Sequence, residues 1–599
     1  MTAISLGLLA LMVSGPFLFP FHTAPIGSFW AEWWAGAFGL GAVAIGLLAR
    51  RGWDIPSPLP LPQQLLIPTV LLVVLLVHFA LGRLVFPQLG LLFATYVIWA
   101  ALLMVLGRTL ADAIGLARLV DVLATAITIG ALISAAIAMV QWLGFDDRVQ
   151  WVFPSASKFG KPGNWGNLTQ QNHLAHYLWL GIASALYLSG RQLLSRGMLW
   201  LLVLPFVFAS ILTHSRSTVI YPLILVAAYA WTRRRDPHGP SARLLVDVAL
   251  LIPVLVALTL FGVWAYARVP ELWAELTNTP PIATRDLSTL GDRLYEMTNT
   301  VSENERHRVT FIRLAWSAFL EHPWLGQGLG NLRWASFLAL AGRSDNALPY
   351  VPENMHNIIF QLLAEFGAPA VIAILLLVAL WAKCYLRQSW GLEHFWCASA
   401  LGFCAAHSLL EYPLWYNFFL GPTALLVGAT SRGKTITLAG RRVTIYLLVA
   451  ALAGALTLGK LRSDYSTLES TFATPLGADP DREKSWWISM DHLLMLHEES
   501  LLSPWALRSI ISLSEPSRKA AKERAVLCEH GVRFTPERSS ITRCAMYLAI
   551  AGRDDDAKKL MTNLLRALPL ERVETEKELA KEVAAFPEIA PLLELSRQR

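Results

Sequence analysis

Long apolar segments alternate with short polar stretches along most of the first 460 residues. A helix that spans a bilayer needs about 20 mostly apolar residues. By this criterion we predict about thirteen membrane-spanning helices and an all-α polytopic membrane protein. The predicted spans are residues 3–20, 33–49, 63–82, 88–107, 119–142, 172–189, 198–213, 217–231, 243–266, 357–382, 393–410, 414–429 and 443–459.

Two polar parts interrupt or follow these spans. One is a large loop over residues 267–355, and the other is a tail over 460–599. In the tail, the helical pattern of SITRCAMYLAIAGRDDDAKKLMTNLLRALP is broken at a Gly-Arg-Asp turn, as in one tetratricopeptide-like helix–turn–helix unit. We therefore predict four parts, which are N-terminal membrane helices over 1–266, the loop over 267–355, C-terminal membrane helices over 356–459 and an α-helical domain over 460–599.

Lys and Arg are unevenly distributed among the loops, which predicts the orientation of the chain. Loops 21–32, 83–87 and 411–413 contain almost none, whereas the alternate loops are rich in them. Because cytoplasmic loops carry the excess of Lys and Arg, we predict a cytoplasmic N-terminus and a periplasmic large loop and tail. The basic loops contain Arg50 and Arg51, Arg108 and Arg118, Arg191 and Arg196, Arg233 to Arg235 and Arg243, Lys383 and Arg387, and Arg432, Lys434, Arg441 and Arg442.

The composition excludes an ordinary soluble protein. Charged residues make up 16% of the chain and hydrophobic residues 55%, whereas soluble proteins carry about a quarter charged residues. The net charge of +7 does not indicate nucleic-acid binding, because the basic residues lie in short loops and form no patch. In the tail, Cys528 and Cys544 could pair in an oxidising periplasm or remain buried thiols, and the sequence leaves both possibilities open.

Polar motifs collect at the predicted periplasmic ends of the spans. Polar and ionisable residues are costly at membrane depth and often mark function. Each motif alone has a simpler interpretation, such as a capping or interfacial residue, but six of them on one side indicate a site. The motifs are PFHTAPIGSFWAEWW with His22, GNWGNLTQQNHLAHYLWLG with Gln171 and His173, THSRSTVI with Arg216, ENERHRVTFIRLAWSAFLEHPWLGQGLGNL with Arg306 and Arg308, PENMHNIIFQLLAEFG with His356 and Asn357, and HSLLEYPLWYNFFLG with Glu411.

The residue types in these motifs suit transfer from a lipid-linked phosphate. The forked guanidinium groups of Arg216 and Arg308 match phosphate oxygens, and a neutral histidine can take a proton from an attacking hydroxyl. Arginines would also stabilise the charge that grows on a leaving pyrophosphate. None of these motifs contains a paired Asp sequence of the DxD type, so a metal-dependent nucleotide-sugar mechanism is disfavoured. The glycines of HPWLGQGLGNL are not followed by Gly-Lys-Ser/Thr, so these motifs contain no P-loop and give no indication of ATP use.

At these motifs the sequence resembles the superfamily of O-antigen ligases, O-antigen polymerases and bacterial O-linked protein oligosaccharyltransferases. HPWLGQGLGNL followed by ENMHNIIFQLLAEFG is similar to the shared ligase region, in which a His-Asn pair opens a helix. The segments PFHTAPIGSFWAE, QQNHLAHYLWLG and HSLLEYPLWYNFFLG favour the protein-glycosylating branch. The motifs cover most of residues 15–420, and the tail matches only loosely.

The resemblance implies an inverting transfer that uses neither a metal nor a cofactor. The donor would be an undecaprenyl-pyrophosphate-linked oligosaccharide, and the acceptor would be Ser or Thr of a periplasmic or pilin-like protein. It makes His356 the candidate base, with Arg216 and Arg308 binding the pyrophosphate. Arg308 is preferred to Arg306 for its register with the following helix. His173, Gln171, Asn357, Glu411 and His22 are candidates for supporting the site.

Two other functions fit the sequence less well. An O-antigen ligase would use the same donor but transfer the glycan to lipid A-core. A membrane transporter would have its polar groups clustered at the midplane of the bilayer, whereas the motifs here gather at one interface. The glycan, the acceptor site, the oligomeric state and the role of the tail are not specified by the sequence.

Overall fold

The computed structural model describes residues 1–49, 59–154, 165–236, 242–277, 303–343, 348–432, 435–438, 440–473 and 482–598. Arg50, Arg51, Lys434 and much of the loop 267–355 lie outside these residues, and nothing is described of the side chains of Arg306 and Arg441. Within the described residues the chain is almost entirely helical, which confirms the predicted all-α polytopic class. Two four-residue strands are the exception, β1 (Leu59–Pro62) and β2 (Thr435–Leu438), which pair antiparallel.

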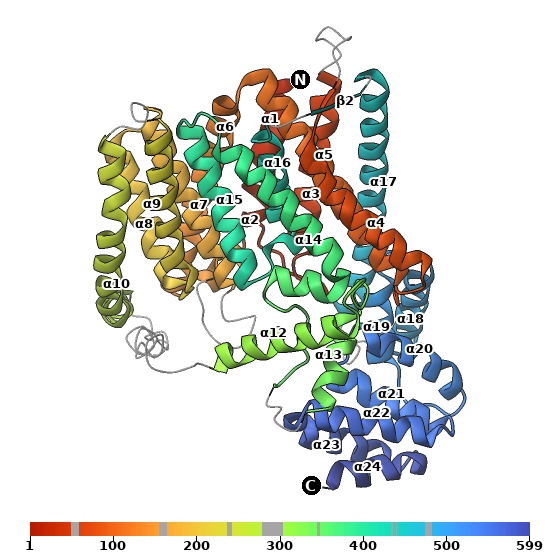
Figure 1. The fold of residues 1–599 in the computed structure, drawn as a ribbon. Coiled ribbons are helices and arrows are strands. Elements are labelled where there is room, and N and C mark those ends of the chain that lie inside the picture. Colours follow the sequence, from red (N-terminus) through yellow and green to blue (C-terminus); the bar gives the residue numbers. More distant parts are fainter. Residues whose placement is uncertain are drawn as a thin grey trace. The chain divides into compact units, whose positions relative to one another are not determined.

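Each of the predicted spans coincides with helical structure (Figure 1). The first span corresponds to α1 and the short α2. The others correspond to one helix each, in the same order along the chain. The helices are α1 (Thr2–Met12), α2 (Gly15–Leu18), α3 (Phe29–Ala49), α4 (Leu66–Ala80), α5 (Pro87–Ile114), α6 (Leu116–Trp142), α7 (Gln171–Gly190), α8 (Arg196–Leu212), α9 (Ser217–Arg235), α10 (Ala242–Thr277), α14 (Ile358–Leu386), α15 (Leu392–Leu410), α16 (Asn417–Ala429) and α17 (Gly440–Ala473).

In the described part of the chain, seven helical segments are long and apolar enough to cross a membrane. The other helices over the predicted spans are shorter or more polar, so the number of thirteen spans stays a prediction. The seven segments are Phe29–Ala49, Gln63–Ala80, Pro87–Ile114, Leu116–Trp142, Arg243–Phe261, Ile358–Leu386 and Arg442–Phe472.

The chain divides into two compact units, each assembled from segments that are distant in the sequence. The first unit comprises Met1–Leu66, Ile98–Ser302 and Leu377–Leu458. The second unit comprises Ile67–Val97, Glu303–Leu376 and Gly459–Arg599. The predicted division into four consecutive parts stays a prediction about how the chain is organised.

The first unit is a helical bundle with an apolar, aromatic-rich core. In Figure 1, α7 packs against α6, α8, α9 and α15. The largest side chains that the unit buries include Tyr177, Trp179 and Trp396. Gly107 allows α5 to touch α16, because a Cβ at this position would lie 2.1 Å from the Leu425 carbonyl oxygen. Such close crossings between membrane helices depend on small residues at the contact.

The second unit contains most of α4, the starts of α5 and α14, the end of α17 and the tail. Its further helices are α12 (Glu303–Glu321), α13 (Leu332–Ala341), α18 (Arg482–Glu499), α19 (Ser503–Leu513), α20 (Ala521–Phe534), α21 (Arg538–Ile550), α22 (Asp554–Ala567), α23 (Arg572–Glu582) and α24 (Ala590–Arg597). The predicted helix–turn–helix is present as α21 and α22, and Gly552 supplies a left-handed residue (φ 80°) in the turn between them.

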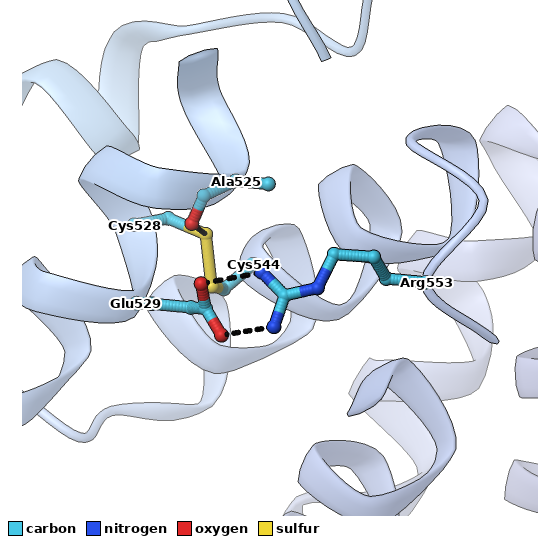
Figure 2. Close-up of a disulfide and its surroundings, with 5 residues drawn as sticks. All are labelled: Ala525, Cys528, Glu529, Cys544 and Arg553. Atoms are coloured by element: carbon cyan, nitrogen blue, oxygen red, sulfur yellow. Dashed lines mark hydrogen bonds and ion pairs between the residues drawn. A yellow bond between two sulfur atoms is a disulfide. The ribbon is translucent and has the colours of Figure 1, made fainter. Parts of the chain in front are cut away.

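A disulfide joins α20 to α21 within the tail. Cys528 and Cys544 are bonded, and their Cα atoms lie 5.4 Å apart. Figure 2 shows the bond beside an ion pair in which the Arg553 guanidinium donates to both carboxylate oxygens of Glu529. The sequence leaves open whether these cysteines form a disulfide or remain buried thiols, and the structure contains the disulfide. Cys384, Cys397 and Cys404 are free.

Candidate functional site

Two clusters of motif residues are present, one in each unit. The cluster in the first unit centres on the start of α7. The Gln170 side chain accepts a hydrogen bond from the backbone N–H of His173 at 2.6 Å, which caps the helix. The residue before it, Thr169, has a left-handed backbone with φ 55°. Gln171 is the first residue of α7 and is half-buried.

Asn172 links this helix start to two other motifs. Its amide nitrogen (Nδ2) donates to Glu411 Oε1 at 2.9 Å, and its oxygen (Oδ1) accepts from the Ser215 hydroxyl at 2.7 Å. Glu411 follows the last residue of α15, and Ser215 lies in the turn between α8 and α9. The segments QQNHLAH, THSRS and HSLLEYP, separated by up to 239 residues, therefore meet in one hydrogen-bonded network.

Behind this network lies a buried group of histidines and aromatic rings. The Nδ1 atoms of His176 and His407 are 2.9 Å apart, which requires one ring to donate and the other to accept. His173 lies with its ring centroid 5.4 Å from that of His407 and 4.9 Å from that of Tyr416. The predicted site residue His173 is thus part of the packing between α7, α15 and the segment before α16.

His22 holds the backbone of a neighbouring loop. Its Nε2 lies 2.5 Å from the Asn167 carbonyl oxygen, and its Nδ1 lies 2.7 Å from the Gly27 carbonyl oxygen. Asn167 in turn donates to the carbonyls of Leu18 and Trp151 and accepts from the Phe153 N–H. In this geometry His22 ties the N-terminal motif to the segment that leads into α7.

The cluster in the second unit is built on α12 and on the start of α14. Arg308 and Phe311 are three residues apart on α12, which places them on the same face of that helix. The Phe311 ring stacks on the ring of His356 with the centroids 5.5 Å apart. Arg308 and His356 are both half-buried. The second unit therefore brings the predicted base to a helix face that also carries a predicted phosphate ligand.

The backbone at His356 is unusual. Its φ is 51°, in the left-handed region that few non-glycine residues adopt. The next residue, Asn357, caps α14, because its side-chain oxygen accepts from the N–H groups of Ile359 and Phe360. The Gln361 side chain accepts from the Met355 N–H at 2.9 Å. His356 is therefore held between two side-chain caps in the turn that precedes α14.

The glycine-rich segment of the large loop supports this helix from the other end. Gly367 (φ 79°) breaks α14, and Gly326 (φ 70°) lies against the break. A Cβ on Gly326 would be 2.3 Å from the Glu365 carbonyl carbon, and one on Gly367 would be 2.4 Å from the Trp324 carbonyl oxygen. Backbone hydrogen bonds from Gln327 and Gly328 to the carbonyls of Ala364 and Glu365 complete the contact. The segment therefore has a structural role, as its turn chemistry indicates.

Several residues of these clusters were not predicted as site residues, and two of them connect predicted ones. Asn172 connects Glu411 to the THSRS turn, and Phe311 supports His356. Asn172 lies inside a quoted motif, but its partners come from distant segments. The sequence contains one indication of a role for Phe311. It lies three residues after Arg308 in a helix, so the two side chains share a face of that helix.

Comparisons with known proteins agree with the motifs. Residues 200–375 match the family described as O-Antigen ligase. Residues 395–581 match the family described as "Virulence factor membrane-bound polymerase, C-terminal". Over 513 residues the chain is 25% identical to the General O-oligosaccharyltransferase of Acinetobacter baylyi (strain ATCC 33305 / BD413 / ADP1), and the match covers 83% of each chain. These matches support a member of the O-antigen ligase superfamily. The two matched regions include Arg216, Arg308, His356 and Glu411, and the matches support a glycosyltransferase-type enzyme of the membrane.

Proposed function

We propose that this chain is a protein O-oligosaccharyltransferase. It would move a glycan en bloc from undecaprenyl pyrophosphate to Ser or Thr hydroxyls of periplasmic or pilin-like proteins, by an inverting reaction that needs no metal ion. The observation that carries the proposal is the α12–α14 cluster, in which His356 stacks on Phe311 three residues from Arg308. The similarity to the Acinetobacter baylyi General O-oligosaccharyltransferase over 83% of the chain supports the choice of reaction.

In this mechanism the acceptor hydroxyl attacks the anomeric carbon of the glycan. His356 takes the hydroxyl proton as a general base, since a neutral imidazole can do so near neutral pH. The new glycosidic bond forms as the bond to the pyrophosphate oxygen breaks, and the electron pair leaves with undecaprenyl pyrophosphate. A single displacement of this kind inverts the anomeric carbon. Arg308 binds the departing phosphate oxygens through its guanidinium fork.

Residues of the first unit are assigned to the same reaction as a prediction. Arg216 is the second proposed ligand of the pyrophosphate, and it lies at the N-terminal boundary of α9. His173, Gln171, Glu411 and His22 are proposed to support the site. The hydrogen bonds of Asn172 to Glu411 and to Ser215, next to Arg216, favour such a supporting role for Glu411.

We also propose that the protein resides in the bacterial inner membrane, with a cytoplasmic N-terminus and with the tail and the reaction in the periplasm. The Lys and Arg distribution supports this orientation. The Cys528–Cys544 disulfide supports it independently, because disulfides persist in oxidising compartments and are rare in the cytosol. A reporter fused near residue 356 that proved cytosolic would refute the proposed enzyme.

The test is glycan transfer by the purified full-length protein in detergent. The reaction contains a defined lipid-linked oligosaccharide and a pilin acceptor, and intact mass spectrometry reports the product. We expect transfer by the wild type and by His492→Ala, a control on an exposed histidine of the same unit that lies outside the motifs. His356→Ala should abolish transfer while inserting and eluting normally. Normal transfer by His356→Ala would remove His356 from the mechanism, and inhibition by EDTA would contradict the metal-free reaction.

A second acceptor class is kept because residues 200–375 match the O-Antigen ligase family. An O-antigen ligase would transfer the same donor glycan to lipid A-core. Offering lipid A-core and pilin together in one reaction separates the two functions. Modification of pilin alone supports the protein oligosaccharyltransferase, and modification of lipid A-core alone identifies a ligase.

A further inference from the structure

Three polar side chains of the first unit form a directional chain of hydrogen bonds. Ser215 donates from its hydroxyl to Asn172 Oδ1 at 2.7 Å, and Asn172 donates from Nδ2 to Glu411 Oε1 at 2.9 Å. Ser215 and Glu411 are buried, with 8% and 4% of their surfaces exposed. Since an ionised carboxylate only accepts hydrogen bonds, Glu411 requires the NH₂ group of Asn172 to face it. The amide oxygen is then left for Ser215, so the carboxyl group of Glu411 and the Ser215 hydroxyl together fix the orientation of the Asn172 amide.

The far end of this chain of hydrogen bonds is a constrained turn. His214 has φ 54°, and the backbone N–H of Ser215 donates to the Thr213 hydroxyl oxygen at 3.2 Å. The Thr213 hydroxyl donates to the Ser210 carbonyl at 2.7 Å. The residue directly after Ser215 is Arg216, at the boundary of α9. Arg216 therefore directly follows a residue whose hydroxyl is hydrogen-bonded to Asn172.

We propose that Asn172 is a positioning residue for Arg216. Its amide nitrogen donates to the carboxyl group of Glu411, and its amide oxygen accepts from Ser215 in the THSRS turn. These two hydrogen bonds would fix the turn so that the guanidinium of Arg216 faces the donor pyrophosphate. This inference rests on the proposed function and deepens that proposal, because it gives the Glu411 carboxyl group the role of anchoring the turn through Asn172. Asn172 itself touches neither donor nor acceptor in this role.

An exchange of the amide and the carboxylate between the two positions tests the inference. Asn172→Asp places a second carboxylate 2.9 Å from Glu411 Oε1 and removes the donor between them. We expect the KM for the lipid-linked donor to rise by on the order of 10-fold, as expected when a charge-assisted hydrogen bond is lost, with little change in the KM for the acceptor. Adding Glu411→Gln to Asn172→Asp restores a donor, because the introduced amide can donate to the introduced carboxylate while Ser215 donates to the other carboxylate oxygen. The double variant should recover a donor KM close to that of the wild type.

Two further variants separate positioning from general damage. Ser215→Ala removes the other link of Asn172 and should raise the donor KM in the same direction by a smaller factor. In an Arg216→Ala background, Asn172→Asp should have no additional effect on the donor KM, because the residue that it positions is already absent. Binding of undecaprenyl pyrophosphate should follow the same order among the variants.

The outcomes distinguish the two proposals. If the wild type transfers no glycan to any acceptor, the proposed function fails, while the binding measurements still report on Asn172. If transfer occurs but the double variant is as impaired as Asn172→Asp, the inference is overturned. The inference is also overturned if Asn172→Asp lowers kcat without changing the donor KM, or if its effect adds fully to that of Arg216→Ala.

Discussion

Removing the Cys528–Cys544 disulfide should lower the free energy of unfolding of the tail by about 3 kcal/mol. The two cysteines are 16 residues apart in the sequence. A crosslink that closes a loop of this length restricts the unfolded chain, and the lost entropy corresponds to about 3 kcal/mol. The double variant Cys528→Ala/Cys544→Ala is preferred, because both side chains are buried and alanine leaves no unpaired polar group there.

The disulfide should contribute more to the stability of the tail than the ion pair beside it does. The Glu529 and Arg553 side chains in Figure 2 are 39% and 41% exposed. Exposed ion pairs typically contribute about 0–1 kcal/mol, and the bidentate geometry of this one places it toward the upper end of that range. Glu529→Gln should therefore lower the stability of the tail much less than the double cysteine variant does.

Native-state proteolysis of the full-length protein in detergent measures the effect. Cleavage within the tail follows the population of its open form, so a loss of about 3 kcal/mol should speed cleavage on the order of 10²-fold. Reductant should speed cleavage of the wild type by a similar factor. Cys384→Ser, at an exposed free cysteine, should leave the rate unchanged. Equal cleavage rates for wild type and double variant would refute the reasoning.

Three other perturbations have expected outcomes. Gly326→Ala should lower the thermal unfolding midpoint and cost more than about 2 kcal/mol, because its φ is 70° and a Cβ would lie 2.3 Å from backbone, whereas Gly342→Ala, at a φ of −82°, should change it little. Burial and nearby positive charges lower the pKa of His530 from 6.5, so the unfolded tail takes up the proton more readily than the folded tail, and stability should fall as the pH drops below about 6.5. His530→Gln should flatten that profile in a proteolysis series, and an unchanged profile would contradict this assignment. Arg216→Ala or Arg308→Ala should reduce donor use on the order of 10²-fold, and Lys should rescue each only partly, since it lacks the fork. Full activity in the Lys variants would count against bidentate phosphate binding.

The positions of the membrane helices could be predicted from the sequence, but the ends of several helices could not. Apolar length identifies where a helix crosses lipid, and each predicted span is helical. However, α17 continues to Ala473 although its apolar segment ends near residue 459, and α10 continues to Thr277. A helix ends where its backbone finds a cap or a breaker, whereas the apolar segment ends where the lipid is predicted to end. The break of α14 at Gly367 was not predicted, although Gly367-Ala368-Pro369 is a typical breaker sequence.

The sequence identifies the motifs of the candidate site, whose role stays a prediction, but it does not specify the contacts between them. Asn172 and Glu411 are 239 residues apart, and nothing in either motif specifies that the Asn172 amide donates a hydrogen bond to the Glu411 carboxyl group. For the same reason the sequence does not decide whether Cys528 and Cys544 form a disulfide. Their pairing depends on how α20 and α21 pack, which brings the two Cα atoms to 5.4 Å, within the range that a disulfide can bridge.

Backbone conformation gives a criterion that is independent of the side-chain chemistry used to find the motifs. Among the described residues outside glycine, positive φ angles occur at Thr169, Gln192, His214 and His356. A left-handed residue costs about 1–2 kcal/mol unless the surrounding structure requires it. Three of these four residues lie in the motifs GNWGNLTQQNHLAH, THSRS and ENMHN, and the fourth follows α7 outside any motif. Because the motifs were chosen for their polar residues and not for their backbone, this coincidence argues that their turns hold side chains in required positions, which is the geometry that a preorganised transfer site needs.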